Sequence, residues 1–375
     1  MSKREITLNF GTKEFKFIDL EHPNANNAFA SYYQSMFGIP AIDMQSFETS
    51  SEAYFNSIED KEDKFLKHDL YFNNFTPVWL NLIQQRRFTE AEKIWRDALD
   101  IAFRWEKYRK LRIHKGTPYY FWAVTCFLNE DIDKGFWLMN QAYIEDKITH
   151  NTEEPDTPSK YFLYFETSQE QQFFRDKLLQ IKEFLNKNLI ENYSTIRSKT
   201  FDYSLFENKF LKNQQISKDV KFHFNLNVFR LERILKQQKP NERNTVASLL
   251  YLEIIFDLCR VFEYLIKINS QDKFLDSVKN LAKEYKVNSA ILQINPSDFN
   301  TDNFMTTLEN ILNNNFQINS STVDNLEKDI LVTYGFRNFG AHKIEENSII
   351  VANFEKIVKS ITNSILLAIE LKPRT

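Results

Sequence analysis

The scarcity of helix-breaking residues constrains the fold of this chain more than any other sequence feature. Six glycines and nine prolines are spread over 375 residues, and long stretches without either residue favour helices. Helical spacing of the apolar residues begins at about residue 50 and continues into the C-terminal part of the chain. We therefore predict an all-α protein, long enough for two or three domains with a sizeable core.

The first twenty residues depart from this helical pattern. Ile6, Leu8 and Phe10 alternate with polar residues, and the alternation resumes after Gly11. A period of two predicts a short β-hairpin or an extended arm. Small polar residues follow the alternating stretch, so we assign residues 1–50 to an arm that wraps the surface.

Two segments in the first half of the chain align with each other at an offset of 44 residues. The equivalent positions are Phe88 and Ile132, Ala91 and Gly135, Trp95 and Met139, and Ala98 and Ala142. Each segment has the pattern of a helical hairpin in which a small residue lets two helices approach. The hairpins resemble tetratricopeptide repeats, whose usual period is about 34 residues, with the extra length at residues 107–115. An ordinary helical bundle is the alternative for this domain, residues 51–150.

The second half of the chain is predicted to form one helical bundle. Residues 149–159 contain two prolines among small polar residues and are the clearest predicted linker. The region after it, residues 160–375, is expected to hold four or five helices. The predicted helices are residues 169–188, 222–238, 244–268, 323–336 and 349–371. The third is apolar around most of its circumference and is therefore expected at the centre of the core.

Composition narrows the classes of function. The formal net charge is −3, so no global positive field attracts nucleic acid, and any RNA contact must come from a local patch. Cys126 and Cys259 lie in apolar runs without a CxxC pair, which indicates neither a zinc site nor a disulfide framework. We also expect no signal peptide and no membrane span, because charged residues interrupt residues 349–371. These features predict a soluble, cytoplasmic protein.

Among six histidines, His342 alone lies in a sequence context that suggests a site. Gly335 and Gly340 flank Arg337, and a helix that ends or kinks at such glycines can turn side chains out of its regular surface. On a regular helix an arginine and a histidine five positions apart would point about 140° apart. A distorted helix end would let Arg337 and His342 converge.

These residue types suit cleavage of a phosphodiester. An imidazole can take a proton from a ribose 2′-hydroxyl or give one to a leaving oxygen. The guanidinium of Arg337 matches the oxygens of a phosphate, and Asn338 could orient His342 or bind a phosphate oxygen. No carboxylate cluster accompanies them, so we expect neither a metal nor another cofactor.

The stretch Arg337–His342 resembles the R-x4–6-H motif of the HEPN (higher eukaryotes and prokaryotes nucleotide-binding) superfamily. The resemblance implies an RNA endonuclease that needs no metal, with Arg337, Asn338 and His342 as catalytic residues. It also implies a homodimer that brings two motifs into one composite site and leaves a 2′,3′-cyclic phosphate.

A second resemblance concerns the repeat half. The stretch from Asp133 to Met139 is similar to bacterial proteins that join tetratricopeptide-like helices to a C-terminal HEPN domain. This arrangement suggests a toxin or antiviral effector whose repeat half receives a signal from a protein or a small molecule. Two alternatives are a non-catalytic scaffold and a HEPN partner of a nucleotidyltransferase.

Two further groups of residues are candidates: a second R-x4-H match and a polar stripe on a predicted helix. Arg109–His114 has lysine where the HEPN motif favours asparagine or aspartate, and we interpret it as a basic loop. On the long helix, Glu253, Asp257, Arg260 and Tyr264 share one face.

This stripe could support the site. Glu253 or Asp257 could hold Arg337, and Tyr264 could stack on a base. A structural salt bridge between Asp257 and Arg260 is the alternative.

Overall fold

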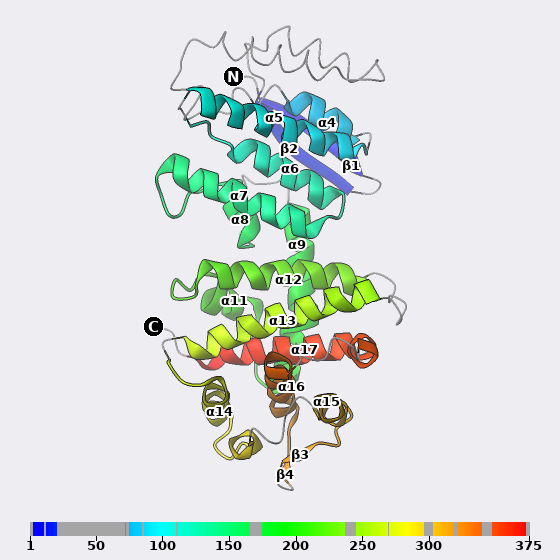
Figure 1. The fold of residues 1–375 in the computed structure, drawn as a ribbon, viewed down its shortest axis with the longest axis vertical. Helices are drawn as coiled ribbons and strands as arrows, with labels where there is room; N and C mark the ends of the chain where they lie inside the picture. The colour runs from blue at the N-terminus through cyan, green and yellow to red at the C-terminus, as the bar shows by residue number, and fades with distance from the viewer. Residues whose placement is uncertain are drawn as a thin grey trace. The chain divides into compact units, whose positions relative to one another are not determined.

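The computed structural model describes residues 3–10, 13–20, 72, 75–84, 86–109, 112–165, 175–236, 245–268, 270–295, 303–318, 321–339 and 347–372. The described chain is predominantly helical, as predicted (Figure 1). It divides into two compact units, Met1–Leu178 and Leu179–Thr375. In the described ranges, no helix combines the length and the apolar character needed to cross a membrane.

The predicted N-terminal hairpin is present. Strands β1 (Lys3–Phe10) and β2 (Lys13–Leu20) pair in antiparallel register. In this register Ile6 lies opposite Phe17. The remainder of the predicted arm, residues 21–50, lies outside the described residues.

Helices make up the rest of the described first unit (Figure 1). They are α4 (Thr76–Gln84), α5 (Phe88–Arg109), α6 (Gly116–Leu128), α7 (Ile132–His150) and α8 (Pro158–Leu163). The next helix, α9 (Arg175–Phe184), contains the division between the two units. Consecutive helices from α4 to α8 contact each other.

The turns confirm the predicted offset of 44 residues between the two helical hairpins. Arg86 before α5 and Glu130 before α7 both have positive φ, 58° and 63°. The N–H groups of residues 86 and 87 donate to the carbonyls of residues 83 and 82. Those of residues 130 and 131 donate to the carbonyls of residues 127 and 126. Both hairpins therefore use the same turn at equivalent positions.

The predicted small residues lie where helices pack closely. Ala91 on α5 is fully buried. A Cβ atom added to Gly135 on α7 would lie 2.8 Å from the ring of Phe127 on α6. The equivalent pair Trp95 and Met139 is also fully buried. The aligned positions are thus core positions in both hairpins.

The predicted linker, residues 149–159, belongs to the first unit and does not separate the units. Helix α7 extends into it and ends at His150, and the next residue, Asn151, has left-handed φ and ψ. Thr157 and Ser159 are buried, and Ser159 donates to Asp146 of α7. Two of the polar residues that suggested a linker, Thr157 and Ser159, instead find hydrogen-bond partners inside the fold.

The second unit is a bundle with several short elements. Its long helices are α12 (Lys218–Lys236), α13 (Thr245–Lys267), α14 (Phe274–Tyr285), α16 (Asn325–Phe339) and α17 (Asn347–Leu371). The shorter helices are α10 (Glu191–Arg197), α11 (Tyr203–Phe206) and α15 (Phe304–Leu312). A 3₁₀ turn (Ala290–Gln293) and a small pair of strands, β3 (Gln317–Ile318) and β4 (Ser321–Thr322), complete the described elements.

Helix α13 lies at the centre of this bundle, as its apolar circumference predicted. It contacts α12, α14, α16 and α17. Ile254, Leu258 and Phe262 are fully buried along it. The predicted bounds of α12, α13 and α17 agree with the structure to within a few residues.

The predicted helix 169–188 is the largest departure. The described helix begins at Arg175 and passes at Leu185–Ile190 into a π-helical segment before α10. A second π-helical segment, Glu207–Leu211, follows α11. The i+5 hydrogen bonding of a π-helix shifts the side chains that follow it around the helix axis.

Candidate functional site

Arg337 and Asn338 lie in the last turn of α16. The helix passes through Gly335, which is buried, and continues to Phe339. The helix therefore does not end at Gly335, and its last residue, Phe339, directly precedes Gly340. A glycine inside a helix costs only about 1 kcal/mol, which the packing of α16 against α13 and α17 can offset.

The remaining part of the motif lies outside the described residues. Gly340 and His342 fall in residues 340–346, between α16 and α17. The predicted convergence of Arg337 and His342 stays a prediction. The described half of the motif consists of Arg337 and Asn338.

Arg337 is held by groups from two other helices. Its Nε–H donates to Oε2 of Glu263 on α13, and its guanidinium lies over the ring of Phe274 on α14, 5.5 Å from the ring centroid. The Arg337 side chain keeps 39% of its surface exposed. Within the described ranges, the guanidinium makes no other hydrogen bond. Its terminal N–H groups are thus available to an anion without loss of a hydrogen bond to those residues.

Asn338 is half-buried beside Tyr334, one turn earlier on α16. Burial raises the pKa of Tyr334, and a hydrogen bond with Asn338 opposes that increase. The ring of Tyr334 stacks on that of Phe274 at 5.8 Å between centroids. Phe274 therefore contacts both the Arg337 guanidinium and the Tyr334 ring.

The predicted supporting carboxylates do not hold Arg337. Glu253 accepts a hydrogen bond from Arg230 on α12 at 3.0 Å, and Asp257 lies 3.7 Å from Arg230. Residues 253 and 257 are one turn apart and face α12, whereas residue 263 lies on another side of α13 and reaches α16. The partner of Arg337, Glu263, was absent from the prediction.

The structural alternative for the polar stripe is confirmed. Asp257 lies 3.8 Å from Arg260 and 3.7 Å from His223 of α12. The ion pair with Asp257 raises the pKa of His223. The hydroxyl of Tyr264 accepts a hydrogen bond from the backbone N–H of Ser217. These contacts link α12 to α13 and do not approach Arg337.

The second R-x4-H match begins at the last residue of α5, and the described charged side chains that follow are paired. Arg112 donates to Glu145 at 2.6 Å, and the buried Lys115 donates to Glu106 at 2.5 Å. The side chain of Arg109 is not among those that the structure describes. Lys115, the residue that follows the match, is therefore buried in an ion pair with Glu106.

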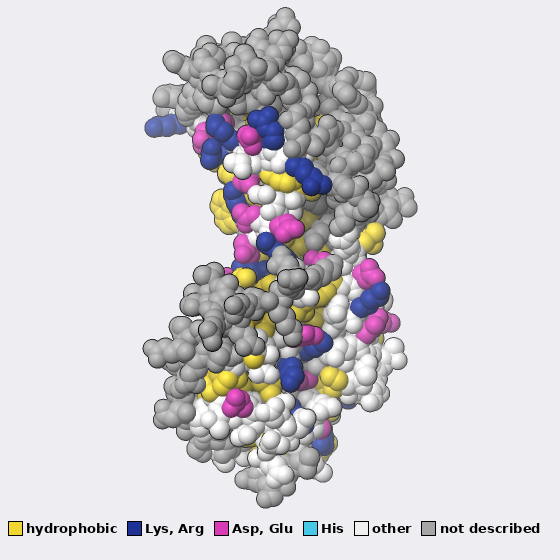
Figure 2. All heavy atoms as spheres, turned by 90° about the vertical axis from the view of Figure 1, so that its right-hand side faces the viewer, with side chains coloured by type: hydrophobic (Ala, Val, Ile, Leu, Met, Phe, Trp, Pro, Cys, Tyr) yellow, Lys and Arg dark blue, Asp and Glu magenta, His cyan; other side chains and the backbone are white. Residues whose placement is uncertain are grey.

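Positive charge is not gathered on the face shown in Figure 2. Lys and Arg side chains alternate there with Asp and Glu side chains over the described residues. Among the described residues, no three His, Cys, Asp or Glu side chains form a group that could hold a metal ion. Arg337 forms an ion pair with Glu263, and 39% of its side chain remains exposed.

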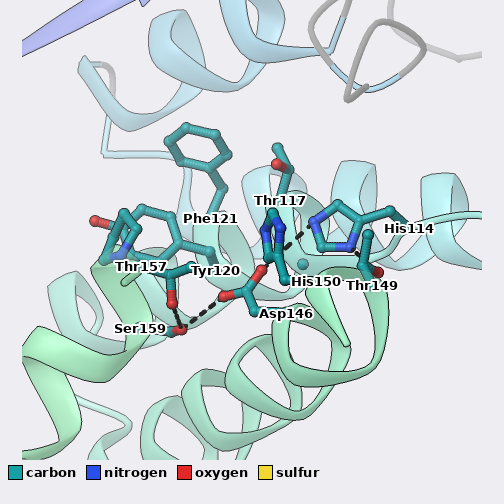
Figure 3. Close-up of a pocket in the computed structure, with 11 residues that line it drawn as sticks. His114, Thr117, Tyr120, Phe121, Asp146, Thr149, His150, Thr157 and Ser159 are labelled. Atoms are coloured by element: carbon teal, nitrogen blue, oxygen red, sulfur yellow. Dashed lines mark hydrogen bonds and ion pairs between the residues drawn. The ribbon is translucent and has the colours of Figure 1, made fainter. Parts of the chain in front are cut away.

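A cavity in the first unit was not predicted. Its volume is about 360 Å³, and it lies between the start of α6, the end of α7 and the start of α8 (Figure 3). The residues that line it include His114, Thr117, Tyr120, Phe121, Asp146, Thr149, His150, Thr157 and Ser159. His114 thus belongs to a cavity, although the sequence placed it in a basic loop.

Hydrogen bonds connect the polar groups of this cavity. Ser159 donates to Oδ2 of Asp146 at 2.9 Å, and Oγ1 of Thr157 lies 2.9 Å from Oγ of Ser159. On the other side, Nε2 of His114 lies 3.5 Å from Oδ1 of Asp146. Nδ1 of His114 lies 2.8 Å from Oγ1 of Thr149. Asp146 is therefore contacted through both of its oxygens.

Comparisons of this chain with protein-family models, with curated proteins and with solved structures find no match.

Proposed function

We propose that the chain is a metal-independent RNA endonuclease of the HEPN type, in which Arg337, Asn338 and His342 act on the phosphodiester. The observation that carries the proposal is the orientation and exposure of the Arg337 side chain. Its guanidinium is oriented by Glu263 and Phe274 yet remains 39% exposed at the end of α16. A positioned arginine with available N–H donors suits a phosphate oxygen.

The chemistry follows from the residue types. The ribose 2′-oxygen attacks phosphorus, the P–O5′ bond breaks, and the products are a 2′,3′-cyclic phosphate and a 5′-hydroxyl. An imidazole accepts the 2′-hydroxyl proton, and a protonated imidazole gives a proton to the 5′-oxygen. One His342 from each of two chains would supply both roles. Arg337 would stabilise the charge that develops on the non-bridging oxygens.

The proposal includes a homodimer and a regulatory half. Each chain contributes one Arg337–His342 motif, so the composite site needs two chains. The helical hairpins of the first unit would act as a tetratricopeptide-like domain that controls the nuclease. The biological class that fits this arrangement is a toxin or an antiviral effector. Its substrate is RNA.

The test uses labelled RNA and the full chain in the presence of EDTA. We expect cleavage by the unaltered protein, and loss of at least a hundredfold in activity in Arg337→Ala and in His342→Ala. Arg260→Ala is the matched control, because Arg260 is a 78% exposed arginine on α13. Equal cleavage by all four proteins, or none by the unaltered protein, would contradict the proposal.

A non-catalytic scaffold is the second candidate, and one observation favours it. Arg337 pairs with Glu263 within its own chain, as a purely structural arginine would. The partial exposure of both side chains, 39% and 20%, makes this pair a weak stabilising contact. A folded dimer that binds no RNA and cuts none would establish the scaffold.

A further inference from the structure

The cavity of the first unit is a second site, separate in sequence and chemistry from Arg337. It is formed by residues 114–159 alone, so it lies within one compact unit. Its volume of about 360 Å³ is at the small end of ligand pockets, which range from roughly 300 to 1,000 Å³. Such a volume suits a ligand of about the size of a nucleoside.

The polar groups of the cavity are organised around one carboxylate. Asp146 is 8% exposed, and burial of a charged group is costly unless its partners are fixed. Ser159 donates to one oxygen, and Nε2 of His114 lies 3.5 Å from the other. On its other side, Nδ1 of His114 is hydrogen-bonded to the Thr149 hydroxyl at 2.8 Å. Together, these contacts hold the Asp146 carboxylate in one orientation.

The start of α6 closes tightly around the same carboxylate. A Cβ atom added to Gly116 would lie 2.6 Å from the ring of His114 and 2.7 Å from Oδ1 of Asp146. Only glycine leaves room for this approach. The backbone at the helix start and the loop before it are therefore fitted to the Asp146–His114 pair.

The charges of the side chains that line the cavity indicate which class of ligand would bind there. Asp146 is the only acidic residue among the described lining residues, and they include no lysine or arginine. A phosphate group would meet the negative charge of Asp146 with no lysine or arginine beside it among these residues. A carboxylate accepts hydrogen bonds from N–H groups, with more than one lone pair on each oxygen. The ligand is thus expected to present N–H donors.

The remaining lining residues suit a flat molecule that carries hydroxyl groups. In Figure 3, Asp146 and Ser159 lie below Phe121, with Tyr120 to one side and Thr117 and His150 to the other. The hydroxyl of Thr117 has no hydrogen-bond partner among the described residues. Aromatic side chains contact the flat faces of bases, and polar side chains bind their edges.

We propose that this cavity binds the base of a nucleoside, whose ring N–H groups donate to Asp146 and whose ribose contacts the threonine hydroxyls. Guanine fits best among the common bases, because its adjacent N1–H and N2–H groups match the two oxygens of a carboxylate. This site is independent of the proposed nuclease centre. It gives the first unit a small-molecule ligand of defined chemistry.

Titration calorimetry on the full chain tests the proposal with guanosine, adenosine, cytidine and uridine. We expect guanosine to bind most tightly, and Asp146→Asn to weaken its binding about tenfold or more. Asp133→Asn is the matched control, since Asp133 is an exposed aspartate on the same helix. Guanosine binding should persist in Arg337→Ala, which separates this site from a substrate site at Arg337.

A second variant covers the case in which Asp146→Asn does not fold. Thr117→Val keeps the shape of a half-buried side chain and removes one hydroxyl, and we expect it to weaken guanosine binding several-fold. The proposal is overturned if no nucleoside binds the unaltered protein. It is also overturned if binding is unchanged in Thr117→Val and in a folded Asp146→Asn, or if putrescine binds this cavity and guanosine does not.

Discussion

Asp329 is a buried carboxyl group at the contact between α16 and α17. It is 8% exposed, and its Oδ2 accepts a hydrogen bond from Asn363 at 2.8 Å. Burial raises the pKa of Asp329 to about 7, although hydrogen bonds with Ser360 and Asn363 oppose the increase. Near neutral pH this residue therefore changes charge inside the bundle that carries Arg337.

The sign of the pH dependence follows from this raised pKa. Between the ordinary pKa of an aspartate, about 4, and the folded value of about 7, the folded chain holds the proton more strongly than the unfolded chain. The contribution of Asp329 to the free energy of unfolding is therefore greatest below pH 4 and is lost as the pH rises to 7. Asp329→Asn removes this dependence.

We expect Asp329→Asn to be more stable than the unaltered protein at pH 8, by on the order of 2 kcal/mol. Urea unfolding at pH 5 and pH 8 measures the difference. Asp276→Asn, at an exposed position on α14, is the control and should leave the pH dependence unchanged. A variant that loses stability at pH 8 would show that Asp329 is ionised and well solvated in the folded chain.

The sequence could identify Arg337 as a candidate site residue, but it could not identify Glu263 as the partner of Arg337. The motif and the helix that carries it are local patterns, and Arg337 does lie at the end of α16. Glu263 is 74 residues away from Arg337 in the chain, and its pairing depends on which side of α13 faces α16. The helical periodicity of α13 placed Glu253 and Asp257 on one face. It could not show which neighbouring helix packs against that face.

Elements with strong apolar periodicity were predicted well. Helices α12, α13 and α17 agree with their predicted ranges because their buried faces repeat over many turns. The π-helical segments at Leu185–Ile190 and Glu207–Leu211 were missed. Their i+5 hydrogen bonding leaves no periodic signal in such short stretches of sequence.

The prediction that residues 149–159 form a linker was wrong for a different reason. Residues 149–159 have the composition of an exposed loop, but Thr157 and Ser159 form a buried relay to Asp146. Composition reports the polarity of a segment and does not show whether its polar groups find partners in the fold. The cavity was hidden from the sequence by the same limitation.

Gly135 tests how closely α6 and α7 must approach. Alanine favours a helix over glycine by about 1 kcal/mol, yet the new Cβ would lie 2.8 Å from the ring of Phe127, which is itself packed against Phe136 and Phe162. We expect Gly135→Ala to lower the free energy of unfolding by about 1–3 kcal/mol. Thermal or urea unfolding measures the change.

Gln141→Ala is the control for Gly135→Ala, because Gln141 is a half-exposed residue on the same helix. We expect its effect to stay within about 0.5 kcal/mol. If Gly135→Ala were neutral or stabilising, the ring of Phe127 could move aside. The small residue of this hairpin would then not be required for helix packing.

On the scale of the whole molecule, the proposed nuclease cannot be complete in one chain. One chain supplies one His342, whereas the cleavage step needs one group to accept a proton and another to donate one. Two chains would supply both groups and two guanidinium groups from Arg337. Activity should therefore depend on association of the chains.

We expect the specific RNA-cleaving activity to fall on dilution, in parallel with the fraction of dimer measured by sedimentation. Mixing experiments sharpen this expectation. An excess of His342→Ala chains added to unaltered protein should lower the activity, because mixed dimers hold one histidine at the composite site. Arg260→Ala chains, which keep the whole motif, should not lower it. Activity that stays constant per chain through dissociation to monomers would show that a single chain cuts RNA, and the composite site would have to be abandoned.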